Sequence, residues 1–204
     1  MSEGKGKARG EELPKDQKAS REVRWAFLRR PPSFLDPIMN RFESPQILRV
    51  IGPYVKKGHV VADLGCGWGY YTFTLANLVG PEGKIYTVDL SNNCIRSIQK
   101  KGDKGGYHNI EAHASTAADL NFILNKSVDF VFANGLLCSM KNSRESAVNE
   151  IKRILKPGGQ AYISLGARPP FGLVDEAEWD KILEGFRVVR GGIFKELWAV
   201  VSLN

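Results

Sequence analysis

The sequence predicts one doubly wound α/β domain whose parallel sheet ends in an antiparallel pair of strands. Three observations support this: five β-rich runs alternate with helical stretches from residue 59 onward, a glycine-rich turn follows the first run, and two further β-rich runs stand close together near the C-terminus. Strands separated by helices form parallel sheets. The 204 residues, 43% hydrophobic and 25% charged, suit one domain with a sizeable core.

Local sequence signals place the helix starts and the strands. Ser44, ahead of a proline, marks the start of one helix, and Ser91 is expected to cap the helix after the second run. Asn142 with Glu145 predicts a capping box for the helix before the fifth run, and Lys156-Pro157-Gly158-Gly159 is expected to end that helix. The five runs span residues 59–64, 84–90, 109–114, 128–133 and 160–165.

The C-terminal region predicts an antiparallel pair. A helix is expected over residues 175–183, followed by β-rich runs at 186–190 and 195–203. A few residues containing Gly191-Gly192 join these two runs. A link this short allows a hairpin and excludes a helical crossover.

The positive charge is concentrated near the N-terminus. The chain carries a net charge of +7, and residues 1–30 hold nine Lys or Arg against five Asp or Glu, a net +4. We predict a basic, partly disordered extension over residues 1–30 and a single domain over 31–204. Trp25, Phe27 and Leu28 lie among the last arginines of the extension, so this part is expected to dock, most simply as a lid on its own domain. An RNA-binding arm is the alternative, because clustered arginines attract phosphates.

Several classes of protein are disfavoured. The chain has no apolar run of about 20 residues and its charged start lacks the apolar segment of a signal peptide, so a cytoplasmic protein without a membrane span is expected. Cys66, Cys94 and Cys138 form no CxxC pair, and we predict neither a disulfide scaffold nor a metal site.

The run Val60 to Gly69 (VVADLGCGWG) is a strand, a glycine-rich turn and the start of a helix. Such a turn lets a ligand approach the backbone, and the ligand can be NAD, FAD or S-adenosylmethionine. Two details favour the last. Tyr70 stands where the dinucleotide pattern GxGxxG needs its third glycine, and Asp63 at the strand end would repel a pyrophosphate. A carboxylate suits the cationic amino group of S-adenosylmethionine.

Asp89 ends the second run, about 20 residues after the turn, where a ribose is expected in this fold. Its carboxylate can accept the protons of both ribose hydroxyls. The alternative is a charge at the start of the helix near Ser91, and ribose binding is the favoured interpretation.

These motifs resemble a known family. Asp63 to Gly69 resembles the DxGxGxG motif of class I S-adenosylmethionine-dependent methyltransferases, Asp89 matches their acidic residue after the second strand, and residues 154–159 resemble their LKPGG turn. The resemblance covers residues 45–204 and identifies the chain as a member of the methyltransferase type 11, UbiE-like group. It implies methyltransferase activity and S-adenosylmethionine as cofactor. It also implies a Rossmann-like seven-stranded sheet of order 3-2-1-4-5-7-6 with strand 7 antiparallel.

The resemblance also implies a set of cofactor-binding residues. Thr116 stands where the family usually has an aspartate that accepts from the adenine amine, in a segment similar to GDAxDLPF. Asn134 ends the fourth strand, beside the expected methyl group. The complete set is Asp63, Gly65, Gly67, Gly69, Asp89, Leu90, Thr116, Ala117 and Asn134.

The acceptor is predicted less directly. Methyl transfer is an in-line displacement that alignment and desolvation can promote, so we assign no catalytic base, and the three histidines are weak candidates. A small-molecule acceptor is favoured because no recognition domain is appended. The alternatives are an RNA or protein methyltransferase that uses the basic extension, and a non-catalytic S-adenosylmethionine-binding module. Residues 34–42, 136–142 and 166–174 are expected to face the acceptor.

Overall fold

A computed structural model describes residues 44–140, 142–165, 176–193 and 197–203. One seven-stranded sheet has the order β3-β2-β1-β4-β5-β7-β6, which confirms the predicted order. Strand β7 pairs antiparallel with β5 and with β6, and the other strand pairs are parallel. The strands are β1 Val60–Leu64, β2 Lys84–Asp89, β3 Ile110–Ala114, β4 Val128–Ala133, β5 Leu155–Ser164, β6 Phe186–Ile193 and β7 Leu197–Leu203. The helices are α3 Ser44–Ile51, α4 Thr72–Val79, α5 Asn92–Gly105, α6 Arg144–Ile154 and α7 Glu176–Leu183.

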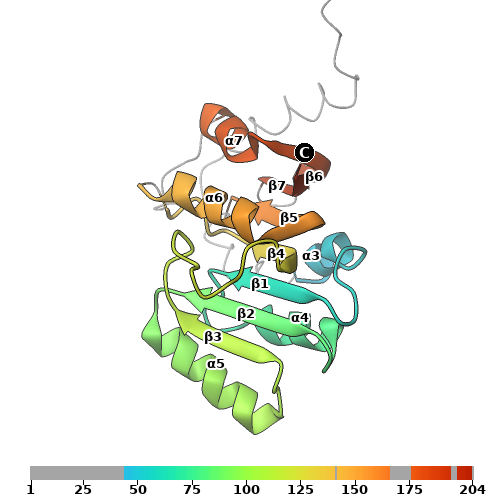
Figure 1. Cartoon of the computed structure of the whole chain (residues 1–204), viewed down its shortest axis with the longest axis vertical. Coiled ribbons are helices and arrows are strands. Elements are labelled where there is room, and N and C mark those ends of the chain that lie inside the picture. The colour runs from blue at the N-terminus through green and yellow to red at the C-terminus, as the bar shows by residue number, and fades with distance from the viewer. Residues whose placement is uncertain (1–43, 141, 166–175, 194–196, 204) are drawn as a thin grey trace, which may run out of the picture.

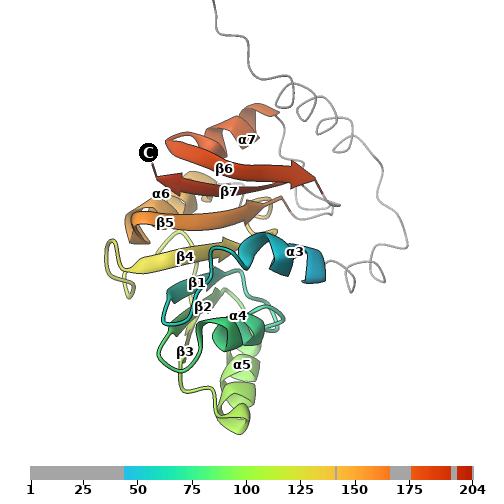
Figure 2. The ribbon, with the colours of Figure 1, turned by 90° about the vertical axis from the view of Figure 1, so that its right-hand side faces the viewer.

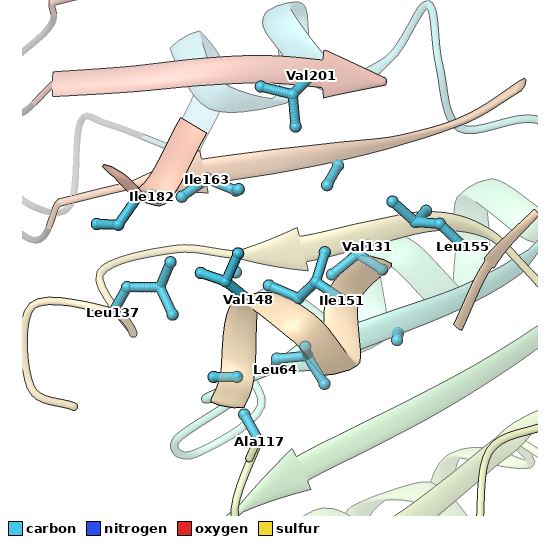
Figure 3. Packing of buried hydrophobic residues seen from close by; sticks show 14 of the residues in the cluster. Leu64, Ala117, Val131, Leu137, Val148, Ile151, Leu155, Ile163, Ile182 and Val201 are labelled. Carbon is cyan, nitrogen blue, oxygen red and sulfur yellow. The ribbon is translucent and has the colours of Figure 1, made fainter. Parts of the chain in front are cut away.

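Helices cover both faces of the sheet, as the doubly wound fold requires (Figures 1 and 2). Successive residues of a strand point to opposite faces, so Phe130 and Phe132 of β4 pack with α3 and α4, whereas Val131 and Ala133 pack with α6 and α7. Figure 3 shows the second of these cores around Ile151. The sheet is therefore fixed from both sides, and its strand ends are held at defined positions.

The connection between β3 and β4 differs from the prediction. Residues 115–127 form turns, and the helical stretch expected between these two strands is absent. The α6 side chains stabilise the turns instead. Glu150 accepts a hydrogen bond from the Leu120 N–H at 2.7 Å, and Arg153 donates to the carbonyls of Leu120 and Ile123 at 2.8 and 2.9 Å. These bonds satisfy backbone groups that a helix would have paired.

Two helix-start predictions have different outcomes. Ser91 caps α5 as predicted, and its hydroxyl accepts a hydrogen bond from the Cys94 N–H at 3.3 Å. The capping box at Asn142 is wrong, because α6 begins one residue later than expected and its N-cap, Ser143, makes no side-chain cap bond. Arg144, the first residue of α6, instead donates to the Leu137 carbonyl at 2.8 Å, so a tertiary contact fixes this helix start.

Two strands are longer than predicted. β5 begins at Leu155, so residues 156–159 belong to the strand and lie at a register shift against β4, rather than ending the helix in a free turn. Gly191 and Gly192 lie inside β6, where they pair with β7. A Cβ at Gly192 would stand 2.9 Å from the Trp198 ring, so the glycine leaves room for the indole. The predicted hairpin is confirmed.

Other predictions from the sequence concern segments outside the described ranges. The predicted extension over residues 1–30, its lid or arm, and the acceptor-facing segments 34–42 and 166–174 lie outside the described residues. Within the described part, no helix is long and apolar enough to cross a bilayer.

Candidate functional site

The carboxyl ends of the parallel strands meet at one edge of the sheet. Leu64 pairs in register with Val88, Asp89 pairs with Ala114, and Asp63 pairs with Phe132. Every predicted site residue stands at the end of one of these strands or in the segment that follows it. The register therefore brings the predicted residues from four strands to a single edge.

The glycine turn between β1 and α4 is built from left-handed backbone. Gly65, Gly67 and Gly69 have φ values of +76°, +52° and +82°, which L side chains rarely adopt. A Cβ at Gly69 would stand 2.8 Å from Ile98, and one at Gly65 would stand 3.0 Å from Leu136. A Cβ at Gly67 would meet nothing within 4 Å. Neighbouring side chains thus leave little room for a Cβ at Gly65 or Gly69, whereas the Cβ position of Gly67 faces open space.

Asp89 joins the turn to the start of α5. One carboxylate oxygen accepts a hydrogen bond from the Gly67 N–H at 2.9 Å, and the other accepts from the Ser91 N–H at 2.8 Å. Each oxygen keeps a second lone pair for a ligand hydroxyl. The carboxylate therefore makes the contact near Ser91 that the sequence left as an alternative, and it also lies at the predicted ligand edge. The neighbouring Leu90 side chain is exposed.

Asp63 is a buried carboxylate with a hydroxyl partner. Its side chain is only 2% exposed and accepts a hydrogen bond from the Thr72 hydroxyl at 2.6 Å. The Thr72 oxygen lies 3.2 Å from that of Thr87. The pKa of Asp63 is raised to about 7, because burial and, to a smaller extent, the charge of Asp89 outweigh the lowering effect of the Thr72 bond. Sequence reasoning did not assign Thr72 and Thr87 to the site.

A sequence signal for one of these threonines existed. Thr87 precedes Asp89 by two residues on the same strand, so both side chains leave the same face of β2. A polar residue at an interior position of an otherwise apolar strand indicates a buried hydrogen bond. Thr72 gave no such signal, because it opens a helix, where threonine is common.

Thr116 and Ala117 stand beside Asp89, because the Ser115 N–H donates to the Asp89 carbonyl at 3.1 Å. The Thr116 hydroxyl accepts a hydrogen bond from the Ala118 N–H at 3.2 Å, which closes a local turn. Ala117 is buried, with 5% exposure. The threonine oxygen already has a donor, so it is a weaker acceptor for a ligand amine than the aspartate usual in the family.

Asn134, at the end of β4, is held by a serine of β5. The Ser164 hydroxyl donates to the Asn134 side-chain oxygen at 2.9 Å and accepts from the Gly135 N–H at 3.0 Å. Ser164 is fully buried and was not predicted. These bonds orient the Asn134 amide at the strand end, where its NH₂ group makes no recorded hydrogen bond within the described residues.

The other reactive side chains near this edge have structural partners. Burial raises the pKa of the Cys66 thiol to about 12, so it stays protonated at neutral pH. The Cys138 thiol donates to the Gly135 carbonyl at 3.1 Å. His113 stacks on Phe122 with ring centroids 3.8 Å apart. The described residues contain no group of three His, Cys, Asp or Glu side chains arranged to hold a metal ion.

A hollow lies between α6 and α7, away from the strand-end residues. It has a volume of about 570 Å³ and contains none of the predicted site residues. Four of its charged side chains form ion pairs, Arg144 with Glu178 at 3.0 Å and Lys181 with Glu145 at 3.3 Å. The hollow therefore presents paired charges, whereas the strand-end site presents two carboxylates without a recorded cation partner in the described part of the chain.

The two carboxylates select among ligands. A pyrophosphate placed against the Gly67 backbone would face the charges of both Asp63 and Asp89 and be repelled. A ligand with a cationic amino group and neighbouring hydroxyls would find an acceptor for each. The donor and acceptor set of this site thus fits S-adenosylmethionine and does not fit a dinucleotide.

The raised pKa of Asp63 predicts a distinct pH dependence of stability. A carboxyl whose folded-state pKa lies above its unfolded value contributes stability that is present near pH 4 and is lost as the pH rises through about 7. Asp63→Asn should therefore gain stability over the wild type across this range, on the order of a few kcal/mol. Urea unfolding without ligand at several pH values measures the difference.

Asp129→Asn provides the matched control. Burial raises the pKa of Asp129, but the Lys156 ammonium and the Val60 N–H outweigh it and lower the pKa below its ordinary value. Its contribution to stability is thus present at neutral pH and is lost as the pH falls, so its difference curve should slope the opposite way. Equal slopes for the two variants would contradict the assignment of Asp63.

Comparison with known proteins also indicates a methyltransferase domain. A family described as a methyltransferase domain matches residues 61–159. Demethylmenaquinone methyltransferase of Geobacillus stearothermophilus is 35% identical over 105 residues, which cover 52% of this chain and 44% of that protein. The enzyme of the same name from Listeria welshimeri is 32% identical over 120 residues, which cover 59% and 48%. The chain spans about half the length of these relatives.

A solved structure extends the likeness over most of the chain. The S-adenosylmethionine-dependent methyltransferase from Aquifex aeolicus aligns with a TM-score of 0.65 and 25% identity, covering 83% of this chain and 100% of that one. The seven-stranded order described above has the same Rossmann-like architecture. The sheet order, the motif order and the sequence match over residues 61–159 together support a class I S-adenosylmethionine-dependent methyltransferase domain in this chain.

Proposed function

We propose that the chain transfers a methyl group from S-adenosylmethionine to a small-molecule acceptor. The observation that carries this proposal is the pair of carboxylates, Asp63 and Asp89, on either side of a glycine turn whose centre faces open space. The cofactor is the one used by the family. The same proposal includes a cytoplasmic location and the predicted domain division, with residues 1–30 as an extension and 31–204 as the domain.

Each predicted residue has a role in holding the cofactor. Asp63 accepts from its amino group, and Asp89 accepts from the ribose hydroxyls. Because Gly65, Gly67 and Gly69 have no side chains, the cofactor can approach the backbone of the turn closely. Of the remaining four, Leu90, Thr116 and Ala117 flank the adenine, where Leu90 supplies apolar surface and the Thr116 hydroxyl can donate its proton, and Asn134 lies beside the methyl group.

The reaction needs alignment more than a base. S-adenosylmethionine, when bound, supplies an already activated methyl group. Asn134, held by Ser164 at the end of β4, is placed to orient an acceptor oxygen or nitrogen through its NH₂ group. Burial keeps the Cys66 thiol protonated, so it does not compete for the methyl group, and the Cys138 thiol donates to the Gly135 carbonyl.

The acceptor class rests on two supports. The named relatives are demethylmenaquinone methyltransferases, whose acceptor is a small molecule. The described helices and strands also all belong to one seven-stranded domain, which is compatible with a small acceptor.

Asp89→Ala should weaken S-adenosylmethionine binding by about 1 to 3 kcal/mol, because the ribose hydroxyls lose a charged acceptor and the Gly67 N–H loses its partner. Titration calorimetry measures the affinity, with Asp103→Ala on the exposed face of α5 as the control that should bind normally. NAD should not bind the wild type. Tight NAD binding, or a folded Asp89→Ala protein with unchanged affinity, would contradict this assignment.

The acceptor fraction can be identified directly. Incubation of the protein and methyl-labelled S-adenosylmethionine with cell extract separated into small-molecule, RNA and protein fractions should label the small-molecule fraction. Asp89→Ala serves as the binding-deficient control, and its labelling should fall about 5-fold or more at limiting cofactor, in line with its lost affinity. Label confined to RNA or protein would replace the proposed acceptor class.

The basic extension carries a second candidate function, methylation of RNA. Its net charge of +4 over residues 1–30 favours an anionic partner. If Arg21, Arg24, Arg29 and Arg30 contact phosphates, RNA affinity should fall steeply with salt and vanish in a protein that begins at Pro31. If the extension is instead a lid, the shortened protein should lose S-adenosylmethionine affinity at every salt concentration. Binding of both proteins to labelled RNA and to cofactor at low and high salt separates the two outcomes.

A further inference from the structure

Buried polar side chains gather at one point of the domain. Among the described residues, five polar or charged side chains are buried, and Asp63, Thr72 and Thr87 form a connected group. They come from β1, from α4, which the glycine turn joins to β1, and from the neighbouring strand β2. Burying unpaired polar groups costs free energy, so a connected group indicates a specific arrangement of hydrogen bonds.

The direction of these hydrogen bonds follows from proton counting. A threonine hydroxyl has one proton to donate. Thr72 lies 2.6 Å from the Asp63 carboxylate, which can only accept when ionised, so the Thr72 proton points there. The Thr72 oxygen is then available as an acceptor in its 3.2 Å contact with the Thr87 hydroxyl, which also contacts the Cys66 thiol. The two hydroxyls form a chain that runs from β2 through α4 to the carboxylate.

Few other groups act on Asp63. Asp89 faces it from β2 with a negative charge, and the Cys66 thiol in the turn is kept neutral by burial. Helix α4 (TFTLANLV) has no titratable side chain, and Phe132 lies opposite Asp63 on β4. The nearby ammonium of Lys101 is bound to the Trp68 carbonyl at 3.3 Å. Thr72 is therefore the group that favours the ionised carboxylate.

We propose that Thr72, oriented by Thr87, is a positioning residue that holds Asp63 as the acceptor for the cofactor's cationic amino group and so sets the lower pH limit of cofactor binding. This inference rests on the proposed function. Only the ionised carboxylate attracts the ammonium group, so affinity should fall as the pH falls and Asp63 gains a proton. Removing the Thr72 hydroxyl should move that loss to higher pH.

The test is the affinity for S-adenosylmethionine between about pH 5.5 and pH 8.5, measured by titration calorimetry for the wild type, Thr72→Val, Thr72→Ser and Thr87→Val. Thr72→Val should move the midpoint up by about one pH unit, weaken binding by up to about tenfold near neutral pH, and approach wild-type affinity at the alkaline end. Thr72→Ser keeps the hydroxyl and should restore the wild-type profile. Thr87→Val should give a smaller shift in the same direction.

Thr74→Val on the same helix is the matched control and should leave the profile unchanged, because no described hydrogen bond involves its hydroxyl. Weakening of Thr72→Val by the same factor at every pH, without rescue by serine, would indicate a merely structural role and overturn the inference. An unchanged profile in Thr72→Val, or in Thr87→Val if the first variant does not fold, would overturn it as well. Failure of the wild type to bind at any pH would instead overturn the proposed function.

Discussion

The site depends on holding two carboxylates close together at the end of adjacent strands. Asp63 is nearly inaccessible to water and feels the negative charge of Asp89, and both effects oppose ionisation. The fold offsets this cost with neutral donors: backbone N–H groups of Gly67 and Ser91 for Asp89, and the Thr72 hydroxyl for Asp63. Neutral donors stabilise a charge without cancelling it, so attraction for a cationic ligand is kept.

The shape of the turn follows from those bonds. The Gly67 N–H reaches Asp89 in a turn whose backbone is left-handed at Gly65, Gly67 and Gly69, conformations that glycine adopts at little cost. The turn also gains two bonds from Gly65 and Cys66 to the Val88 carbonyl, at 2.8 and 3.1 Å. The glycine spacing is thus a requirement of the Asp89 contact as much as of ligand access.

The sequence predicted what depends on local pattern and missed what depends on distant partners. The strand alternation and glycine spacing placed Asp63 and Asp89 correctly, because parallel strands always align their ends. The capping box at Asn142 failed because Arg144 is anchored by Leu137 and Glu178. Ser164 and Asn134 share a hydrogen bond but lie 30 residues apart in the sequence, so no local pattern predicts this pair.

The connection after β3 illustrates the same limit. Residues 115–127 have a composition compatible with a helix, yet Glu150 and Arg153 pair with the turn's backbone. Those two side chains lie about one helical turn apart on α6 and form an ion pair at 2.7 Å. Tertiary hydrogen bonds outweighed helix propensity, which contributes less than about 1 kcal/mol per residue.

The opposite edge of the sheet shows why the carboxyl edge is the functional one. Asp129 is the second residue of β4 and accepts hydrogen bonds from the ammonium of Lys156, in the LKPGG segment, at 2.8 Å and from the Val60 N–H at 2.9 Å. Its charge is neutralised, its pKa is lowered, and it ties β1, β4 and β5 together. Asp63, on the neighbouring strand, has the opposite pKa shift because its partner is a hydroxyl. A carboxylate paired with a cation has its charge satisfied within the fold, whereas one held by a neutral hydroxyl still attracts a cation from outside.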